Sequence, residues 1–393
     1  MTAQNHLTGI DAMHARVLVI ELEPTHYKTD LWNAVVDTGE IEVRVIYTER
    51  HNWSRDGGHD YQRFPADRYE AEVLSGRGFA GALHSTAKVL GACHKLAPEL
   101  IYIAGYVHFQ TVAAILYATL FGKRFVVHGD VFNNSMPEGR LRLLKWAMRQ
   151  SLRRLIFARA DSVLVCGKQG MATGLEAGCP KHKLVDFPYS VSLARIQADT
   201  PIDIPKSCLE DLQVGGAIVF FSGRMIPRKG LSTLLEAMAR LETNMDWVLW
   251  IEGAGPDLEV HEKHAYRLGI SERCRFLGFC QYDLHSWLIR SAEIVVVPSL
   301  KDSWGVVVDE GLQLGKAVIS SDATGSGQDR IESGANGFIF PAGNDIVLAE
   351  ILQTLLNQPD LKVRIGRAAA AGHRNIRPED NAANLVKVVD RKR

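Results

Sequence analysis

The segment Ile294–Asp322, IVVVPSLKDSWGVVVDEGLQLGKAVISSD, contains two β-branched runs with a loop and a helical pattern between them. The first run, Ile294–Val297, is short and wholly apolar, as expected of a strand buried on both faces, and a Pro-Ser pair ends it. A helical pattern begins at Gly305 and ends at Gly315, and the second run, Ala317–Ser320, follows. The segment therefore predicts a strand–helix–strand unit of a parallel sheet.

The loop before this helix is a candidate phosphate site. A helix start presents unpaired backbone N–H groups and the positive end of the helix dipole at the carboxyl edge of the sheet. Two acids lie eight positions apart, Asp302 in the loop and Glu310 in the helix. One can lie beside the phosphates, and the other can reach a group about one helical turn further along, such as a ribose. Taken singly, each acid fits a solvated surface charge at least as well.

The full pattern, PS-x3-SWG-x3-DEG-x3-GK-x-V, resembles the signature of the retaining family 4 glycosyltransferases of the GT-B fold. That family usually has Glu at both acid positions, whereas this chain has Asp at the first. The resemblance implies that Asp302 lies against the donor sugar and that Glu310 holds the nucleotide ribose. It also implies that four residues offer backbone amides to the sugar and diphosphate: Ser303, Trp304, Gly305 and Val306.

A second block, GRMIPRKGLSTLLEAM, follows the predicted strand Ala217–Ser222. Gly223 allows a tight turn, and Arg224 and Lys229 flank the start of a helix. Two cations of this kind suit the neutralisation of a leaving diphosphate, although loop cations are commonly just exposed. The glycosyltransferase family has a similar Gly-Arg and Lys-Gly block, and the resemblance assigns Arg224 and Lys229 to the donor diphosphate.

The resemblance is weaker in the first half of the chain. His128, in an HGD triplet after a predicted strand, is implied to point at the donor sugar near its reacting carbon, although a lone His is equally often structural. The Gly-rich turn that family members often have after the first strand is replaced by ELEPTHYKTD at 21–30. The usual Asn-Gly-Val-Asp near the hinge reads YSVS at 189–192, and Asp329 stands near the usual position of a Glu.

Length and alternation predict two α/β domains, each a doubly wound, Rossmann-like parallel sheet, and the resemblance implies that the two face each other across a cleft as in the GT-B fold. The chain has 393 residues, more than one core usually supports, and 46% are hydrophobic. We predict an acceptor-side domain over 1–195, a nucleotide-sugar domain over 196–375 and, by resemblance, a last helix over 376–393 that returns to the first domain. The polar stretch Gln197–Gln213 is the predicted hinge.

Eleven strands are predicted from short apolar runs between helical patterns. A long Gly- and Asp-rich loop, His51–Gly81, is predicted to cover the acceptor site. Its glycines Gly76, Gly78 and Gly81 match G-x-G-x-x-G, but the stretch before them is a poor buried strand, which favours a flexible turn over a dinucleotide site. The predicted strands are Arg16–Leu22, Ile41–Tyr47, Leu100–Ile103, Arg124–His128, Ser162–Cys166, Ala217–Ser222, Trp247–Glu252, Arg275–Leu277, Ile294–Val297, Ala317–Ser320 and Phe338–Phe340.

The segment Arg140–Arg159 contains seven basic residues and no acidic one. Ser135 and Glu138 before it have capping-box spacing, and apolar and basic residues recur on separate helical stripes. The basic stripe is Arg142, Lys145, Arg149 and Arg153. Such a helix docks on an anionic membrane surface, or else packs into the core with its charges in water, and the sequence favours neither alternative.

Composition limits the compartment and the partners. Lys plus Arg and Asp plus Glu number 45 each, which argues against a nucleic-acid binder. The six cysteines form no C-x-x-C pair, so buried thiols in a reducing compartment are expected. With no signal peptide and no run of eighteen apolar residues, we predict a cytoplasmic protein, which is peripheral on the inner face of the plasma membrane if the Arg140–Arg159 helix docks there. Without Asp-x-Asp or metal-spaced Cys and His, we expect metal independence and no cofactor.

The resemblance, carried by the two blocks at 223–229 and 298–318, implies a retaining hexosyltransferase. Its donor is a nucleotide diphosphate sugar, and its acceptor is a lipid-linked or polysaccharide intermediate of cell-surface glycan synthesis. A nucleotide-sugar epimerase or hydrolase of the same fold is the enzyme alternative, and a catalytically weak scaffold of a glycan-assembly complex is the alternative from another class. A nicotinamide-dependent dehydrogenase, from the glycine pattern at 76–81, is a distant third.

Overall fold

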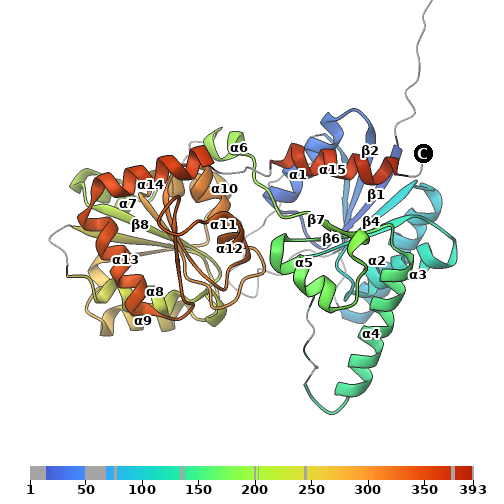
Figure 1. Cartoon of the computed structure of the whole chain (residues 1–393), viewed down its shortest axis with the longest axis horizontal. Coiled ribbons are helices and arrows are strands. Elements are labelled where there is room, and N and C mark those ends of the chain that lie inside the picture. The colour runs from blue at the N-terminus through green and yellow to red at the C-terminus, as the bar shows by residue number, and fades with distance from the viewer. Residues whose placement is uncertain are drawn as a thin grey trace, which may run out of the picture.

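The structure is a computed structural model that describes residues 15–48, 68–74, 78–132, 135, 138–198, 201, 203–242, 246–372 and 377–391. It contains two separate parallel sheets, of seven and six strands, each with helices on both faces (Figure 1). The predicted fold class, two doubly wound α/β domains, is confirmed.

The first sheet has the strand order β3-β2-β1-β4-β5-β6-β7, and every pairing in it is parallel. The order reverses between β1 and β4, so the chain winds outward from the middle in both directions. The strands are β1 Ala15–Glu21, β2 Ile41–Tyr47, β3 Glu70–Val73, β4 Leu100–Ala104, β5 Phe125–Gly129, β6 Ser162–Val165 and β7 Leu184–Asp186.

The second sheet has the order β10-β9-β8-β11-β12-β13, again with parallel pairing throughout. Its order reverses between β8 and β11, and ligands of open α/β sheets bind beyond the carboxyl ends of strands at such a reversal. The strands are β8 Ala217–Ser222, β9 Trp247–Glu252, β10 Cys274–Gly278, β11 Ile294–Val297, β12 Ala317–Ser321 and β13 Phe338–Phe340.

Helices connect the strands and cover both sheets (Figure 1). Those between the strands of the first sheet are α1 His26–Asp37, α2 Gly78–Lys95, α3 Phe109–Leu120, α4 Arg142–Arg159 and α5 Gly167–Glu176. The others are α6 Leu193–Ala198, α7 Lys206–Val214, α8 Leu231–Ala239, α9 Leu258–Arg267, α10 Tyr282–Ser291, α11 Val306–Gln313, α12 Gly325–Arg330, α13 Asp345–Asn357, α14 Pro359–Gly372 and α15 Pro378–Asp390.

Two short strands escaped the sequence analysis. The first, β3, lies inside the predicted loop His51–Gly81, so that prediction is wrong over 70–73, and α2 begins at Gly78; residues 49–67 and 75–77, with Gly76, lie outside the described residues. Its sequence, EAEV, lacked an apolar run because it is an edge strand with one neighbour, β2. The second, β7, has only three residues at the other edge of the sheet.

The last helix, α15, packs against α1. Its residues Leu385, Val388 and Val389 are buried in the core of the first sheet, together with Trp32 of α1. The predicted hinge Gln197–Gln213 is partly wrong, because most of its second half is helix α7, which is tied to the second sheet. Asp211 of α7 accepts a hydrogen bond from Trp250 Nε1 at 2.8 Å and pairs with Arg275 at 2.7 Å.

Helix α4 differs from its prediction in two respects. It begins at Arg142 without a side-chain cap, so the expected capping box of Ser135 and Glu138 does not form. Arg153 does not join the solvent-facing basic stripe: it is 1% exposed, its guanidinium lies 5.3 Å from the ring centroid of Phe132, and it donates to Tyr106 Oη. The aromatic rings stabilise the buried cation by cation–π contact.

Candidate functional site

A cavity of about 350 Å³ lies at the carboxyl end of the second sheet, where the strand order reverses. Residues that follow β8 and residues that follow β11 line it from the second domain, and residues of the first domain line its opposite side. The predicted residues on its wall are Gly223, Arg224, Lys229, Asp302, Trp304, Gly305, Val306 and Glu310. Two predicted site residues, Ser303 and His128, are not among the described residues that line it.

Two cations lie on the β8 side of the cavity. Arg224 follows the end of β8, and Lys229 ends a short 3₁₀ helix, Pro227–Lys229. Lys229 Nζ lies 2.5 Å from Asp302 Oδ2, and Ser299 Oγ donates to the same oxygen at 3.4 Å. The lysine therefore bridges the two blocks that the sequence analysis singled out, and Asp302 is held by a cation and a hydroxyl.

The close approach of the two blocks depends on Gly230. Its φ is +72°, a conformation that side chains disfavour, and a Cβ there would lie 1.9 Å from the carbonyl oxygen of Pro298. The chain after Lys229 thus passes directly against the end of β11, which brings the lysine within reach of Asp302.

We expect Gly230→Ala to lower the free energy of unfolding by about 3 kcal/mol, because it adds an overpacking cost to the backbone cost. Gly269→Ala is the matched control: its φ is +75°, and a Cβ there meets nothing within 4 Å. The control should lose only about 1 kcal/mol. Urea unfolding, monitored by tryptophan fluorescence, measures the free energy of unfolding of both variants. Equal losses in the two variants would mean that the contact with Pro298 adds nothing to the backbone cost.

The loop between β11 and α11 is fixed by the start of α12. Asp302 N donates to Ala323 O at 3.0 Å, and Ser326 Oγ donates to Trp304 O and Gly305 O at 2.5 and 2.8 Å. Gly305, with φ +84°, is the N-cap of α11, and a Cβ there would lie 2.6 Å from Thr324 Cγ2. The first turn of α11 therefore faces the cavity through a rigid loop, with the positive end of its dipole toward any bound anion.

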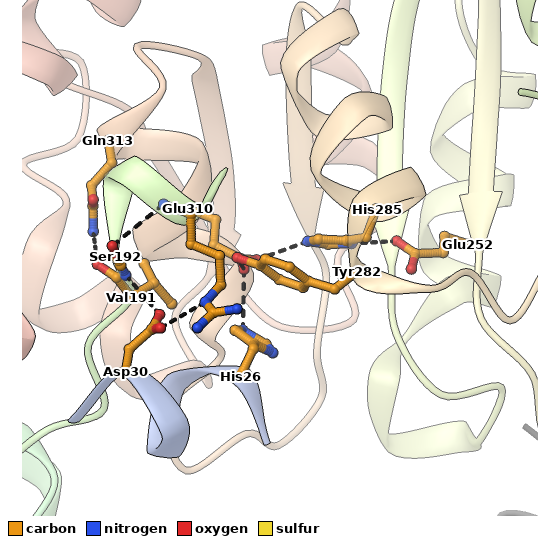
Figure 2. A network of polar contacts seen from close by, with 10 residues as sticks. His26, Asp30, Val191, Ser192, Glu252, Tyr282, His285, Glu310 and Gln313 are labelled. Atoms are coloured by element: carbon orange, nitrogen blue, oxygen red, sulfur yellow. Dashed lines mark hydrogen bonds and ion pairs between the residues drawn. The ribbon is translucent and has the colours of Figure 1, made fainter. Parts of the chain in front are cut away.

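Glu310 lies on the same helix and is 1% exposed. Tyr282 Oη donates to Glu310 Oε1 at 3.2 Å, and His26 Nε2 of the first domain lies 3.4 Å from that oxygen (Figure 2). Burial alone would raise the pKa of Glu310, but His285 and His26 outweigh it and hold the pKa below its ordinary value. Glu310 is thus an ionised acceptor on the cavity wall.

Sequence reasoning missed the aromatic partners of Glu310. The rings of His26 and Tyr282 stack with centroids 4.2 Å apart, although the two residues belong to different domains. His26 belongs to the segment 21–30, which replaces a Gly-rich turn, and that departure was the one sequence signal that pointed here. Nothing in the local sequence around Tyr282 indicated its contact.

His128 lies outside the cavity and is 5% exposed. Its Nδ1 is hydrogen-bonded to Tyr102 Oη, and its Nε2 lies 3.7 Å from Cys166 Sγ. Burial lowers its pKa to about 3, so the ring is neutral at physiological pH. Its neighbour Asp130 does line the cavity, where Tyr189 Oη donates to Asp130 Oδ1 at 2.5 Å. From the HGD triplet, the structure therefore brings Asp130 rather than His128 to the site.

Two polar contacts link the first domain to helices α12 and α6. Asp329 of α12 accepts a hydrogen bond from the backbone N of Lys168, in the first turn of α5, at 2.9 Å. Arg195 of α6 pairs with Asp30 of α1 at 2.6 Å. These contacts hold the first domain against the loops that surround the cavity.

No group of three or more His, Cys, Asp or Glu side chains that could hold a metal ion occurs among the described residues. None of the helices within the described ranges is long and apolar enough to cross a membrane. All six cysteines are free and buried, in line with the expectation from their apolar surroundings.

Residues 210–371 match the family model described as glycosyl transferases group 1. The chain is 28% identical over 229 residues to the lipopolysaccharide core biosynthesis glycosyltransferase LpsE of Rhizobium meliloti, which covers 57% of this chain and 61% of the relative. It is 29% identical over 154 residues to the alpha-D-kanosaminyltransferase of Streptomyces kanamyceticus, covering 39% and 40%. The chain thus spans less than two thirds of the length of these relatives.

Solved structures share the fold over almost the whole chain. The Anabaena protein Alr3699/HepE in complex with UDP and glucose superposes with a TM-score of 0.73 at 17% identity, over 96% of this chain and all of that one. The lipopolysaccharide glycosyltransferase WaaG superposes with a TM-score of 0.68 at 15% identity, over 95% and 99%. At these identities the likeness establishes the fold.

Proposed function

With residues 210–371 carrying a glycosyl transferases group 1 domain in a chain of GT-B fold, we propose that this protein is a retaining hexosyltransferase. It takes the hexosyl group from a nucleotide diphosphate sugar and passes it to an acceptor hydroxyl. One observation carries the proposal: Arg224, Lys229, the start of α11 and Glu310 converge on one cavity where the strand order of the second sheet reverses. This combination matches a diphosphate joined to a ribose.

The leaving diphosphate determines the chemistry of the site. As the bond between the sugar C1 and the phosphate oxygen breaks, negative charge grows on that oxygen. Arg224 offers a planar fork of donors, Lys229 a mobile point charge, and the first turn of α11 its dipole. Such preorganised groups stabilise charge that develops in the transition state. They supply the neutralisation for which other enzymes use a divalent ion, so we propose transfer without a metal.

The acceptor step follows on the same face of the sugar. The acceptor oxygen forms its bond to C1 on the side that the phosphate leaves, and the departing phosphate oxygen takes the acceptor's proton. The configuration at C1 is thereby retained. Asp302, fixed by Lys229 at 2.5 Å, contacts the sugar hydroxyls in this arrangement, and Glu310 binds the ribose. Residues of the first domain that line the cavity, Asp130 among them, face the acceptor.

A transfer assay tests the proposal. The protein is incubated with UDP-, GDP- and ADP-sugars and with lipid-linked or oligosaccharide acceptors, with and without EDTA, and the product's anomeric configuration is read by NMR. We expect transfer from one donor class, with retained configuration and an undiminished rate in EDTA. Release of free sugar at the full rate without acceptor would instead indicate a hydrolase or epimerase. Nucleotide binding without turnover on any donor would indicate a scaffold.

Helix α4 supports a membrane-borne acceptor. Its first turns, here called the α4 tip (residues 141–148), are exposed at every position and project from the first domain (Figure 1). Leu144 and Met148 are 55% and 64% exposed, and Arg142 and Lys145 lie beside them. The later part of α4 packs into the core through Ile156 and Phe157, whereas the α4 tip does not. Exposed apolar residues mixed with cations suit the surface of an anionic bilayer.

We expect wild-type protein to bind vesicles that contain phosphatidylglycerol and to bind pure phosphatidylcholine vesicles much more weakly, since each cation contributes about 1 kcal/mol near an anionic surface. The double variant Leu144→Glu/Met148→Glu should have a partition coefficient into the phosphatidylglycerol vesicles more than about tenfold lower than wild type, because two apolar side chains no longer insert into the bilayer. Leu175→Glu, at an exposed position on α5, is the control. Cosedimentation measures all three, and equal binding by the double variant and the control would contradict a docking role for the α4 tip.

A further inference from the structure

Three buried ionisable side chains form a line along the cavity wall: Glu252 at the end of β9, His285 on α10 and Glu310 on α11 (Figure 2). His285 Nδ1 lies 2.6 Å from Glu252 Oε2, and its Nε2 lies 3.1 Å from Glu310 Oε2. Each of the three is less than a tenth exposed. The imidazole thus spans the two carboxylates with one ring nitrogen toward each.

This geometry fixes the charge of His285. A neutral imidazole has only one N–H donor, whereas here both ring nitrogens face a carboxylate acceptor. Burial alone would lower the pKa of His285, but Glu252 and Glu310 outweigh it and hold the pKa well above its ordinary value. The ring is an imidazolium that donates one charge-assisted hydrogen bond to each carboxylate.

The same contact orients Glu310. Because His285 occupies Oε2, the carboxylate presents Oε1 to the side where Tyr282 and His26 lie. The residues that reach Oε1 thus come from both domains, whereas the contact to Oε2 is made by the buried side chain of His285. A carboxylate fixed in this way offers a nucleoside one preorganised, ionised acceptor.

We propose that His285 is a positioning residue, which Glu252 orients and which in turn holds Glu310 aimed at the ribose hydroxyls of the donor nucleotide. The inference rests on the proposed function and adds a selectivity: ribonucleotides are preferred over deoxyribonucleotides, and the preference depends on His285. A hydrogen bond from a ribose hydroxyl to an ionised acceptor contributes about 1.5–3 kcal/mol, and a deoxyribonucleotide that lacks the hydroxyl loses it.

The experiment compares ribo- and deoxyribonucleotides by calorimetry. UDP with 2′-deoxy-UDP and GDP with 2′-deoxy-GDP are titrated into wild type and His285→Gln. The wild type should prefer the ribonucleotide, and the ratio of the two affinities should fall about tenfold in the variant. KM for the donor should rise while kcat changes little. The matched control is His264→Gln on α9, which removes an imidazole that lies 3.6 Å from Glu236 of α8. This variant should keep the wild-type ratio.

A pH series separates positioning from a merely structural role. In the wild type the ratio should be constant from pH 8 to pH 5, because Glu310 stays ionised. In His285→Gln burial is no longer offset by that cation, so the pKa of Glu310 rises and the ratio falls toward pH 5. The diphosphate titrates equally in both nucleotides and cancels from the ratio. Other titratable groups face this pair: Glu252 and Tyr282 contact His285, and Cys280 lies near Glu252. Because His26 also faces Glu310, the series is repeated in a His26→Gln background.

The outcomes are distinct. A folded His285→Gln that keeps the wild-type ratio at every pH overturns the inference and leaves the proposed function intact. If that variant does not fold, Glu252→Gln should lower the ratio in the same direction by a smaller factor, and an unchanged ratio there overturns the inference equally. Wild-type protein that binds neither nucleotide of either pair, and does not bind ADP either, overturns the proposed function and this inference with it.

Discussion

Lys229→Ala is expected to lower kcat for sugar transfer by about 10²- to 10³-fold, the usual cost of removing one preorganised group that stabilises charge in a transition state. Lys229 Nζ lies on the cavity wall and 2.5 Å from Asp302, so its loss both removes a cation from the diphosphate and frees the carboxylate beside the sugar. The effect should appear in kcat and kcat/KM together, because the charge on the leaving oxygen develops only as its bond breaks.

Steady-state kinetics with the preferred donor measure this effect. The matched control is Lys206→Ala, which removes a lysine that is 91% exposed on α7, outside the cavity, and it should be indistinguishable from wild type. A near-normal rate for Lys229→Ala would contradict the assignment of this cavity to the leaving diphosphate. Thermal melting of both variants verifies that the loss is not one of folding.

Glu310→Gln is expected to raise KM for the donor by about 10- to 100-fold with a smaller loss in kcat, since a hydrogen bond to a charged acceptor contributes about 1.5–3 kcal/mol. The amide is close to isosteric but carries no charge, so the ribose loses its ionised acceptor. The variant also leaves the buried imidazolium of His285 with one carboxylate rather than two, and the free energy of unfolding should fall at neutral pH.

The pH dependence of that stability loss follows from the direction of the shift. The pKa of Glu310 is lowered in the folded protein, so its stabilisation is fully present above its unfolded pKa and is lost as the pH falls through the folded value. The difference in the free energy of unfolding between wild type and Glu310→Gln should therefore persist from pH 7 down to about pH 4.5 and disappear only below that pH. Glu259→Gln, at an exposed position on α9, is the control for both measurements. A difference in the free energy of unfolding that disappears between pH 7 and pH 5 would contradict the lowered pKa of Glu310.

The strands that position the site could be predicted because they are buried. A parallel strand covered on both faces must be apolar throughout, and Ile294–Val297 and Ala217–Ser222 have that signature and occupy the predicted ranges. The edge strands β3 and β7 lack it, since one is polar and the other has three residues. A sequence pattern reports burial, and an edge strand is only half buried.

The two blocks of the site could be paired because of topology. Arg224 and Lys229 follow β8, Asp302 and Gly305 follow β11, and adjacent parallel strands end at the same edge of a sheet. No such rule links His26, Tyr282 or His285 to Glu310. Their contacts depend on how the two domains face each other and on which side of α10 is inward, and neither is encoded in local spacing.

The environments of two polar residues could not be predicted. His128, which the resemblance implies to face the donor sugar, is buried beside Tyr102, and Arg153, which helical spacing placed on the basic stripe, is buried beside Phe132. A polar side chain with partners of its own inside a domain is stable there, and only the three-dimensional neighbourhood reveals those partners.

Calorimetric titration of wild type and Lys229→Ala with UDP, GDP and ADP tests the central claim most directly, that a nucleoside diphosphate occupies the cavity between β8 and β11. One of the three should bind wild type at a single site, and at a hundred times its dissociation constant it should add about 2.7 kcal/mol of stability. The same nucleotide should bind Lys229→Ala at least tenfold more weakly. Absence of binding by all three, or equal affinity in the two proteins, would contradict the account.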